Sequence, residues 1–263
     1  MSAYEKQARR GQARRYLAEI ARDEAAVRAS QQLRHTVFAG EMGARLHTRV
    51  AGLDYDEFDD YCDHLLVLDT DTGQVVACTR LLADDQAAKL GQFYSEGEFE
   101  LAGVLALPGR FLEIGRTCVD PGHRGSAVLS TLWSGLAEHV HRGGFNYLMG
   151  CASITPGPHG FAVDAVYRQI SPCQFGPEEL AVKPKKPVPG WKRCRQDESG
   201  IPPLLQAYLR LGAQVLGEPC WDEDFNVMDV FILLDLSRLS ERYEKRYLAT
   251  SIQDSHAAAT ANA

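Results

Sequence analysis

The sequence predicts an α/β protein whose helices pack on a mixed sheet (an α+β arrangement), and three observations predict it. Strand-like and helix-like segments alternate along the chain. Residues 111–140 run from an apolar strand through a turn rich in Gly and Pro into an amphipathic helix. Residues 226–236 (NVMDVFILLDL) are apolar on both faces, as in a strand at the centre of a sheet. Together these segments favour helices layered on a mixed sheet.

The N-terminal segment, residues 3–33, is rich in Ala, Arg and Glu and is predicted to form a helix. Its apolar residues recur at the spacing of one helical face: Ala13, Tyr16, Leu17, Ile20 and Ala21. A basic block lies near its start: Arg9, Arg10, Arg14 and Arg15. We interpret this block as a solvated face, with an anionic partner as the alternative.

The next elements are predicted as strands separated by polar turns. Residues 64–68 (HLLVL) and 74–82 (QVVACTRLL) are expected to pair, since turn-forming residues separate them. Residues 147–153 (YLMGCAS) predict a further buried strand. Residues 202–212 (PPLLQAYLRLG) predict a helix, because Pro stands at its start and Gly at its end.

A single domain is expected over residues 1–250, because a chain of 263 residues can bury a substantial core. Residues 155–200 are rich in Pro, Gly and Lys and are interpreted as a loop or lid inserted into that domain. Residues 251–263 are expected to be a disordered tail.

Composition and charge narrow the class of protein. The chain is 45% hydrophobic and 24% charged, as in soluble globular proteins, and its net charge of −7 argues against a nucleic-acid partner. It lacks an apolar run of about 18 residues and the apolar core of a secretory signal. Seven widely spaced cysteines without a CxxC motif predict reduced thiols. We therefore expect a cytoplasmic protein.

The strand within 111–119 carries Glu113 and Arg116 in an otherwise apolar run, where a charge is costly unless it is paired or functional. The turn that follows ends in three residues at the start of a helix: Arg124, Gly125 and Ser126. Backbone N–H groups at a helix start, together with an Arg, suit a phosphate or pyrophosphate. These features predict an active centre for a phosphate-tethered substrate, with structural ion pairs as the alternative.

The turn and helix VDPGHRGSAVLSTLW resemble the phosphate loop of the GNAT superfamily of N-acyltransferases. A longer ordered set, from LRHTVFAGEMG through EFDDYCDHLLV, VVACTRLL, LEIGRTCV and GCAS to DEDFNVMDVFILLDL, resembles the ornithine–acyl-carrier-protein N-acyltransferases over residues 30–245. These are cousins of acyl-homoserine lactone synthases and N-acyl amino acid synthases. The resemblance implies a GNAT-like fold with a basic loop insertion and a C-terminal helix.

The resemblance also implies the reaction. A (3-hydroxy)fatty acyl group would pass from acyl carrier protein to the α-amine of an amino acid, with ornithine as the favoured acceptor. The donor is a phosphopantetheine thioester, so no cofactor and no metal is expected. The alternatives are an N-acyl amino acid or acyl-homoserine lactone synthase with another acceptor, and a non-catalytic module that binds carrier protein or membrane.

Carried over by position, the pattern of the related acyl-homoserine lactone synthases falls on seven residues: Arg34, Phe38, Asp56, Asp59, Arg80, Glu113 and Arg116. Amide formation needs an unprotonated amine, so a carboxylate must take the proton. Glu113 is the first candidate for this base and Asp59 the second. Arg116 or Arg80 would grip the substrate carboxylate. Asp56 or Asp59 would hold a side-chain ammonium.

Backbone N–H groups near Cys118 and Val119, where such a strand commonly separates from its neighbour, would polarise the thioester carbonyl. A rival reading makes Cys118 or Cys151 a nucleophile, paired with a His such as His64 or His141. Joint metal binding by two histidines two positions apart, His139 and His141, is disfavoured, because that spacing points them to different helix faces.

A basic segment lies at residues 183–195, with Trp191 among its charges. Its basic residues are Lys183, Lys185, Lys186, Lys192, Arg193 and Arg195. A solvated loop is one interpretation. The functional alternatives are docking of an acidic acyl carrier protein and peripheral contact with anionic lipid on the cytoplasmic face of the inner membrane.

Overall fold

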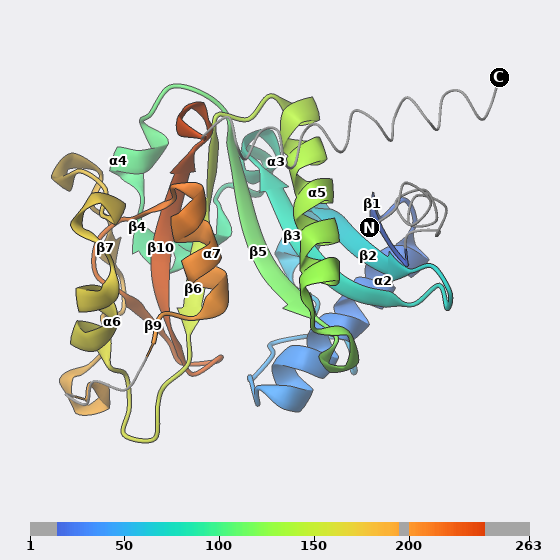
Figure 1. Cartoon of the computed structure of the whole chain (residues 1–263), viewed down its shortest axis with the longest axis horizontal. Helices are drawn as coiled ribbons and strands as arrows, with labels where there is room; N and C mark the ends of the chain where they lie inside the picture. The colour runs from blue at the N-terminus through green and yellow to red at the C-terminus, as the bar shows by residue number, and fades with distance from the viewer. Residues whose placement is uncertain (1–14, 195–199, 240–263) are drawn as a thin grey trace, which may run out of the picture.

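In the computed structural model, which describes residues 15–194 and 200–239, the chain folds around a mixed sheet (Figure 1). The strands are β1 (Tyr16–Ile20), β2 (Asp63–Asp69), β3 (Val75–Ala83), β4 (Phe99–Glu100), β5 (Phe111–Val119), β6 (Tyr147–Ile154), β7 (Lys183–Pro184), β8 (Gln214–Val215), β9 (Cys220–Asp222) and β10 (Val227–Asp235). The main sheet has the order β1-β2-β3-β5-β6-β10-β8, β9 pairs with β10, and β4 pairs with β7. The paired strands are antiparallel except β5 and β6, which are parallel. The predicted mixed sheet is confirmed.

Helices cover both faces of the sheet (Figure 1). They are α2 (Glu24–His35), α3 (Asp84–Leu90), α4 (Ala102–Leu105), α5 (Ser126–Gly143), α6 (Val163–Gln169) and α7 (Pro203–Leu211). The apolar stripes of α5, α6 and α7 pack on one face, where Leu132 of α5 joins Leu65 and Leu112 of the sheet. The other face is covered by α2, α3 and α4, where Leu33 of α2 packs near Leu66. Burial on both faces explains why the central strands are apolar throughout.

The predicted N-terminal helix is wrong for Tyr16–Ile20, which form the edge strand β1 antiparallel to β2. Ladder bonds to β2 outweigh the helical spacing of the apolar residues, which is a weak local preference. The helix begins at Glu24, after Asp23 accepts a hydrogen bond from the backbone N–H of Ala26. Of the predicted basic block, Arg15 pairs with Asp69 at 3.2 Å, and the other three arginines lie outside the described residues.

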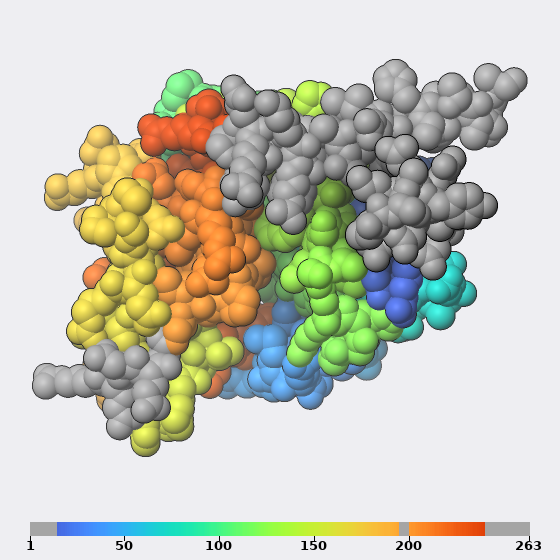
Figure 2. All heavy atoms as spheres, in the orientation of Figure 1, coloured from blue at the N-terminus to red at the C-terminus, as the bar shows by residue number. Residues whose placement is uncertain are grey.

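The described part of the 155–200 segment packs into the folded body. Phe161 just before α6, Val166 within it and Val188 after it are buried against β6, β10 and α7. Figure 2 shows this segment, in yellow, at the edge of the molecule opposite β1. The tail at 251–263 lies outside the described residues. Among the helices of 15–194 and 200–239, none has the length and apolar character that crossing a membrane requires.

Candidate active site

Strands β5 and β6 separate near their middle. They pair at Phe111–Glu113 with Tyr147–Met149, and no further pair between them is present in the described sheet. Just beyond the last pair, Gly150 lies so close to the carbonyl oxygen of Ile114 that a Cβ at this position would collide with it. Glycine therefore lets the two backbones approach closely where they begin to part.

A bulge in β5 lies beside this separation. The register between β3 and β5 shifts between Cys78 and Arg80, and Arg116 there has a left-handed φ of 52°, which residues with a Cβ rarely adopt. Beyond the bulge the N–H of Asp120 bonds the carbonyl of Val76 on β3 at 2.8 Å.

Alternation along an antiparallel pair then directs the N–H of Cys118 toward β3 and turns that of Val119 toward the side where β6 has separated. The predicted role of Cys118 as a carbonyl-polarising donor is therefore corrected, because its N–H faces a neighbouring strand. Val119 stays a candidate donor.

Two cavities border the separation, and Ile114, Cys151 and Tyr208 line both. The larger, about 480 Å³, lies between α5 and α7, the green and orange helices on the face seen in Figure 2. Its lining is mostly apolar and includes Trp133, Leu136, Leu148, Leu211 and Ile232. The smaller cavity, about 240 Å³, has a charged lining: Arg80, Glu98, Glu113, Arg116, Asp222 and Asp229.

Glu113 lies in the wall of the charged cavity and is 3% exposed. Its carboxylate accepts hydrogen bonds from the backbone N–H of Tyr94 at 2.7 Å, from the backbone N–H of Ser95 at 2.8 Å and from the Ser95 hydroxyl. A carboxylate has about four acceptor positions, so one remains. Burial raises the pKa of Glu113 even though these hydrogen bonds oppose the shift. A raised pKa moves a carboxylate toward the range in which a general base works best.

A buried ion-pair network lies beside the same cavity. The guanidinium of Arg34 lies 2.9 Å from a carboxylate oxygen of Asp54 and 2.7 Å from one of Asp59. Arg80 lies 2.6 Å from Asp56 and 3.2 Å from Asp59. Asp56 and Asp59 also form a reciprocal capping box in the 3₁₀ helix Glu57–Tyr61. The acidic segment therefore folds around two arginines.

This network changes the interpretation of three residues predicted to contact substrate. Arg34, Asp56 and Asp59 line neither cavity, whereas Phe38 and Arg80 line the charged one. Burial opposes ionisation of Asp59, but Arg34 and Arg80 outweigh it and hold its pKa below the usual value. A carboxylate so engaged is a poor base and has no free side for an ammonium. We assign Arg34, Asp56 and Asp59 positioning roles, because ion pairs within the network already engage their charges.

Arg116 links the network to the cavity. Its Nε lies 3.3 Å from Asp54 and its Nη2 3.6 Å from Asp56, while its Nη1 donates to the hydroxyl of Tyr94 at 3.2 Å. Burial opposes the charge, but Tyr94, Asp54 and Asp56 keep the pKa of Arg116 above its usual value. Arg116 also lines the charged cavity, and a guanidinium has about five N–H donors. It can therefore hold the network and grip a ligand carboxylate together.

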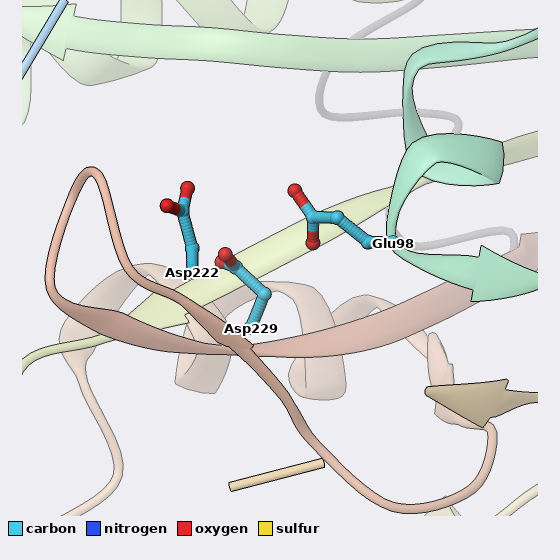
Figure 3. Close-up of side chains that lie close together, drawn as sticks. All are labelled: Glu98, Asp222 and Asp229. Atoms are coloured by element: carbon cyan, nitrogen blue, oxygen red, sulfur yellow. The ribbon is translucent and has the colours of Figure 1, made fainter. Parts of the chain in front are cut away.

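Sequence reasoning missed three carboxylates in the charged cavity, Glu98, Asp222 and Asp229. One oxygen from each lies within 4.8 Å of the other two, and Figure 3 shows the three groups pointing toward one another. It also missed Tyr208 of α7, which lines both cavities. Burial raises the pKa of the Tyr208 hydroxyl to about 12. An Asp inside the apolar run of β10 was the available signal, since a charge there must be paired or functional.

The predicted phosphate loop lies where α5 begins. Gly125 is the N-cap residue and Ser126 the first residue of an 18-residue helix, and no side chain caps the helix start. Arg124 forms a paired contact with Glu41, at 2.7 Å for its Nη1. The uncapped N–H groups suit an anion. Arg124 would release the exposed Glu41 in order to bind that anion.

The cysteine alternative lacks support in the geometry. Cys118 contacts Cys78, with 3.6 Å between their sulfur atoms, and this hydrogen bond and burial raise the pKa of the Cys118 thiol. Burial raises the pKa of Cys151 as well. His64 directs its ring nitrogens at Ser30 and at a backbone carbonyl. Nucleophilic cysteines need a lowered pKa, so these thiols are suited to packing.

The two neighbouring histidines of α5 face different surroundings, as their spacing predicted. His139 lies 3.7 Å from Asp63, whereas His141 lines the apolar cavity. The pair therefore forms no common site.

The basic segment is partly neutralised. Lys186 pairs with Glu223 at 2.5 Å, and Arg193 lies 3.6 Å from Glu218. No ion pair of Lys183 or Lys185 is present in the part of the chain that the structure describes. Lys192 stacks on the rings of two tryptophans, and Trp191 is 76% exposed. Arg195 lies outside the described residues.

The sequence is similar to a known domain family and to known acyltransferases. The model of the acetyltransferase (GNAT) domain matches residues 33–134. The L-ornithine N(alpha)-acyltransferase of Rhodobacter capsulatus is 36% identical over 88% of this chain and 94% of that protein. The L-ornithine N(alpha)-acyltransferase of Brucella abortus is 34% identical over 87% of each chain.

Solved structures share the fold at low sequence identity. A CoA-dependent acyl-homoserine lactone synthase matches 85% of this chain and 83% of its own with a TM-score of 0.52 at 18% identity. The acyl-homoserine lactone synthase LasI matches 89% of this chain and 95% of its own with a TM-score of 0.52 at 13% identity. Together with the match to the GNAT domain over residues 33–134, these likenesses bear out the GNAT-like fold implied by the sequence.

Proposed function

The chain belongs to the family of the L-ornithine N(alpha)-acyltransferases, and we propose that it transfers a (3-hydroxy)fatty acyl group from acyl carrier protein to the α-amine of ornithine. The product is an N-acyl-ornithine, the lyso form of an ornithine lipid. One observation carries the proposal beyond the family: an apolar cavity and a charged cavity meet where β5 and β6 separate. Such a pair suits a lipid chain and an amino acid that react at their junction.

The donor would lie along the α5 side of the junction. The phosphate of the phosphopantetheine binds the uncapped N–H groups at Gly125 and Ser126, and the thioester reaches the separated strands. The acyl chain occupies the apolar cavity between α5 and α7. The N–H of Val119 is the candidate donor to the thioester carbonyl oxygen.

The acceptor would lie in the charged cavity. Arg116 binds its carboxylate, and Glu113 takes a proton from the α-ammonium, directly or through one water. The amine nitrogen then attacks the thioester carbon, a C–N bond forms and the C–S bond breaks. The nitrogen loses its excess proton as the amide forms, and the Tyr208 hydroxyl relays a proton to the departing thiolate, which leaves as the free thiol. The raised pKa values of the cysteines favour this direct attack over an acyl-enzyme.

Mass spectrometry of the purified protein with 3-hydroxypalmitoyl carrier protein and a mixture of free amino acids tests the function. We expect N-acyl-ornithine as the main product. A different acylated amino acid would correct the acceptor and keep the reaction. Product formed with CoA thioesters alone would reject the carrier protein as donor. No product with either donor would favour the non-catalytic module.

The basic segment is the candidate surface for the acidic carrier protein. Lys183 and Lys185 keep their charges free of described ion pairs, whereas Lys186 is engaged by Glu223. Opposite charges steer encounter over distances comparable to the Debye length, which is about 10 Å at 0.1 M salt. The exposed Trp191 favours a second role at an anionic membrane surface, since Trp rings suit the membrane interface.

Replacing both Lys183 and Lys185 by Glu should raise the KM for acyl carrier protein about tenfold at low salt and progressively less at high salt. Steady-state kinetics at several ionic strengths measures this, with Lys89→Glu on α3 as the control. An unchanged KM at low salt would contradict carrier docking here. Loss of binding to anionic vesicles with that unchanged KM would assign the surface to lipid.

A further inference from the structure

Three carboxylates from distant parts of the sequence face one another, and none of them forms an ion pair with a residue that the structure describes. Glu98 precedes β4, Asp222 ends β9 and Asp229 lies in β10, and one oxygen of each lies within 4.8 Å of the others (Figure 3). Asp229 is 2% exposed. Bringing like charges together away from water is unfavourable unless a positive group joins them.

The hydrogen bonds of the cluster leave acceptor atoms open. Asp229 accepts from the Ser153 hydroxyl at 2.6 Å through Oδ1, and Asp222 accepts from the N–H groups of Asp224 and Phe225 through Oδ1. The Oε2 atom of Glu98 is buried and has no hydrogen-bond partner. Glu98 therefore has a buried oxygen without a hydrogen-bond partner in a group that faces two other carboxylates, and such an oxygen is costly unless a donor binds there.

Electrostatics agrees with this geometry. Burial, followed by repulsion from Asp229 and Asp222, raises the pKa of Glu98. Burial raises the pKa of Asp229 to about 7. Arg116, which lines the same cavity, forms its ion pairs with Asp54 and Asp56. A bound cation would stabilise the ionised form of the cluster.

The cluster belongs to the cavity in which the acceptor is placed. All three carboxylates line it, together with Glu113 and Arg116. Asp229 stands opposite Ser153 of β6, two residues beyond Cys151, which borders both cavities. An amino acid whose carboxylate lies at Arg116 and whose α-amine faces Glu113 can direct its side chain at the cluster.

We propose that Glu98, Asp222 and Asp229 bind the side-chain ammonium of the acceptor and so select a cationic amino acid. The inference rests on the proposed function, since it assigns the acceptor's far end within the same cavity. An ammonium has three N–H donors, and each carboxylate supplies one acceptor. Asp56 and Asp59, the pair expected from the sequence to hold this group, are engaged by Arg80 and Arg34 instead.

Two conservative variants, Asp222→Asn and Asp229→Asn, test the inference, because the amide oxygen keeps the existing hydrogen bonds. The readout is the ratio of kcat/KM for ornithine to kcat/KM for norvaline, which lacks the side-chain ammonium. We expect each variant to lower this ratio about 10- to 100-fold, the loss of one or two charged hydrogen bonds. Asp224→Asn, in the same turn but facing Arg45 and His47, should keep the ratio.

The outcomes separate this inference from the proposed function. A wild-type enzyme that forms no N-acyl-ornithine defeats the proposed function. A wild-type enzyme that forms it while both variants keep the wild-type ratio overturns the subsite alone. Calorimetry of wild-type protein with Mg²⁺ gives an independent readout. Tight Mg²⁺ binding that both variants lose, together with loss of activity in a chelator, would make the cluster a metal site and also overturn the inference.

Discussion

Replacing Glu113 by Gln should lower kcat about 10²- to 10⁴-fold, the usual contribution of a positioned base. The carboxylate lies in the wall of the charged cavity with one acceptor position open, and burial raises its pKa. In the wild-type enzyme kcat/KM should rise with pH as Glu113 loses its proton. The variant should lack this rise. Single-turnover acyl transfer over a pH series measures both effects.

Glu113→Gln also has a structural consequence, which must be separated from its effect on catalysis. Both oxygens of Glu113 accept hydrogen bonds from Tyr94 and Ser95, and a Gln must turn its NH₂ toward one of these donors. Loss of a buried hydrogen bond costs about 1–3 kcal/mol. Ser95→Ala is the matched control, because it perturbs the same turn and leaves the carboxylate in place. Equal losses of kcat in both variants, with an unchanged pH profile, would reduce Glu113 to a positioning residue.

Replacing Arg34 by Met should lower the free energy of unfolding by about 3–5 kcal/mol, the usual effect of removing one partner of a buried ion pair. Arg34 is 1% exposed, and its loss removes the shorter ion pair of both Asp54 and Asp59, leaving them with Arg116 at 3.3 Å and Arg80 at 3.2 Å. Urea denaturation at neutral pH measures the change. Arg28→Met on the exposed face of α2 is the control and should cost about 0.5 kcal/mol or less, since Arg28 forms only an exposed helical pair with Glu24.

The loss of unfolding free energy in Arg34→Met should depend on pH in a defined direction. Arg34 and Arg80 hold the folded-state pKa of Asp59 below its usual value. A carboxylate with a depressed folded pKa stabilises the fold above its unfolded pKa, about 3.9, and loses this contribution as the pH falls through the folded value. The difference between wild type and Arg34→Met should therefore be full at neutral pH and shrink below pH ~4. A difference independent of pH would show that Arg34 acts by packing alone.

The local patterns of the sequence determined much of the fold. The strands predicted at 64–68, 74–82 and 147–153 match β2, β3 and β6 to within a residue at each end, because turn residues bound their apolar runs. The Gly before Ser126 and the Pro at 203 mark helix starts by their own backbone preferences. These signals lie within a few residues of one another, so a single sequence contains them.

Tertiary structure decided what those local signals left open. Tyr16–Ile20 have helical spacing but form a strand, because they pair with the edge of β2. That edge lies more than 40 residues away in the chain, so the local pattern does not show it. The acidic segment around Asp56 and Asp59 resembled a substrate contact, yet two arginines from α2 and β3 neutralise it. Long-range pairing is invisible to periodicity, which reports one element at a time.

The sequence by itself therefore determined most of the local strands and helices, the family and the two charges of β5 at the centre of the site. Only the folded chain brought Glu98 together with Asp222 and Asp229, which are more than 100 residues apart from it. Taken singly, Glu98 and Asp222 look like solvated turn residues. Their chemistry arises when the sheet buries them beside Asp229, because the pKa and the partner of a carboxylate depend on its surroundings in space.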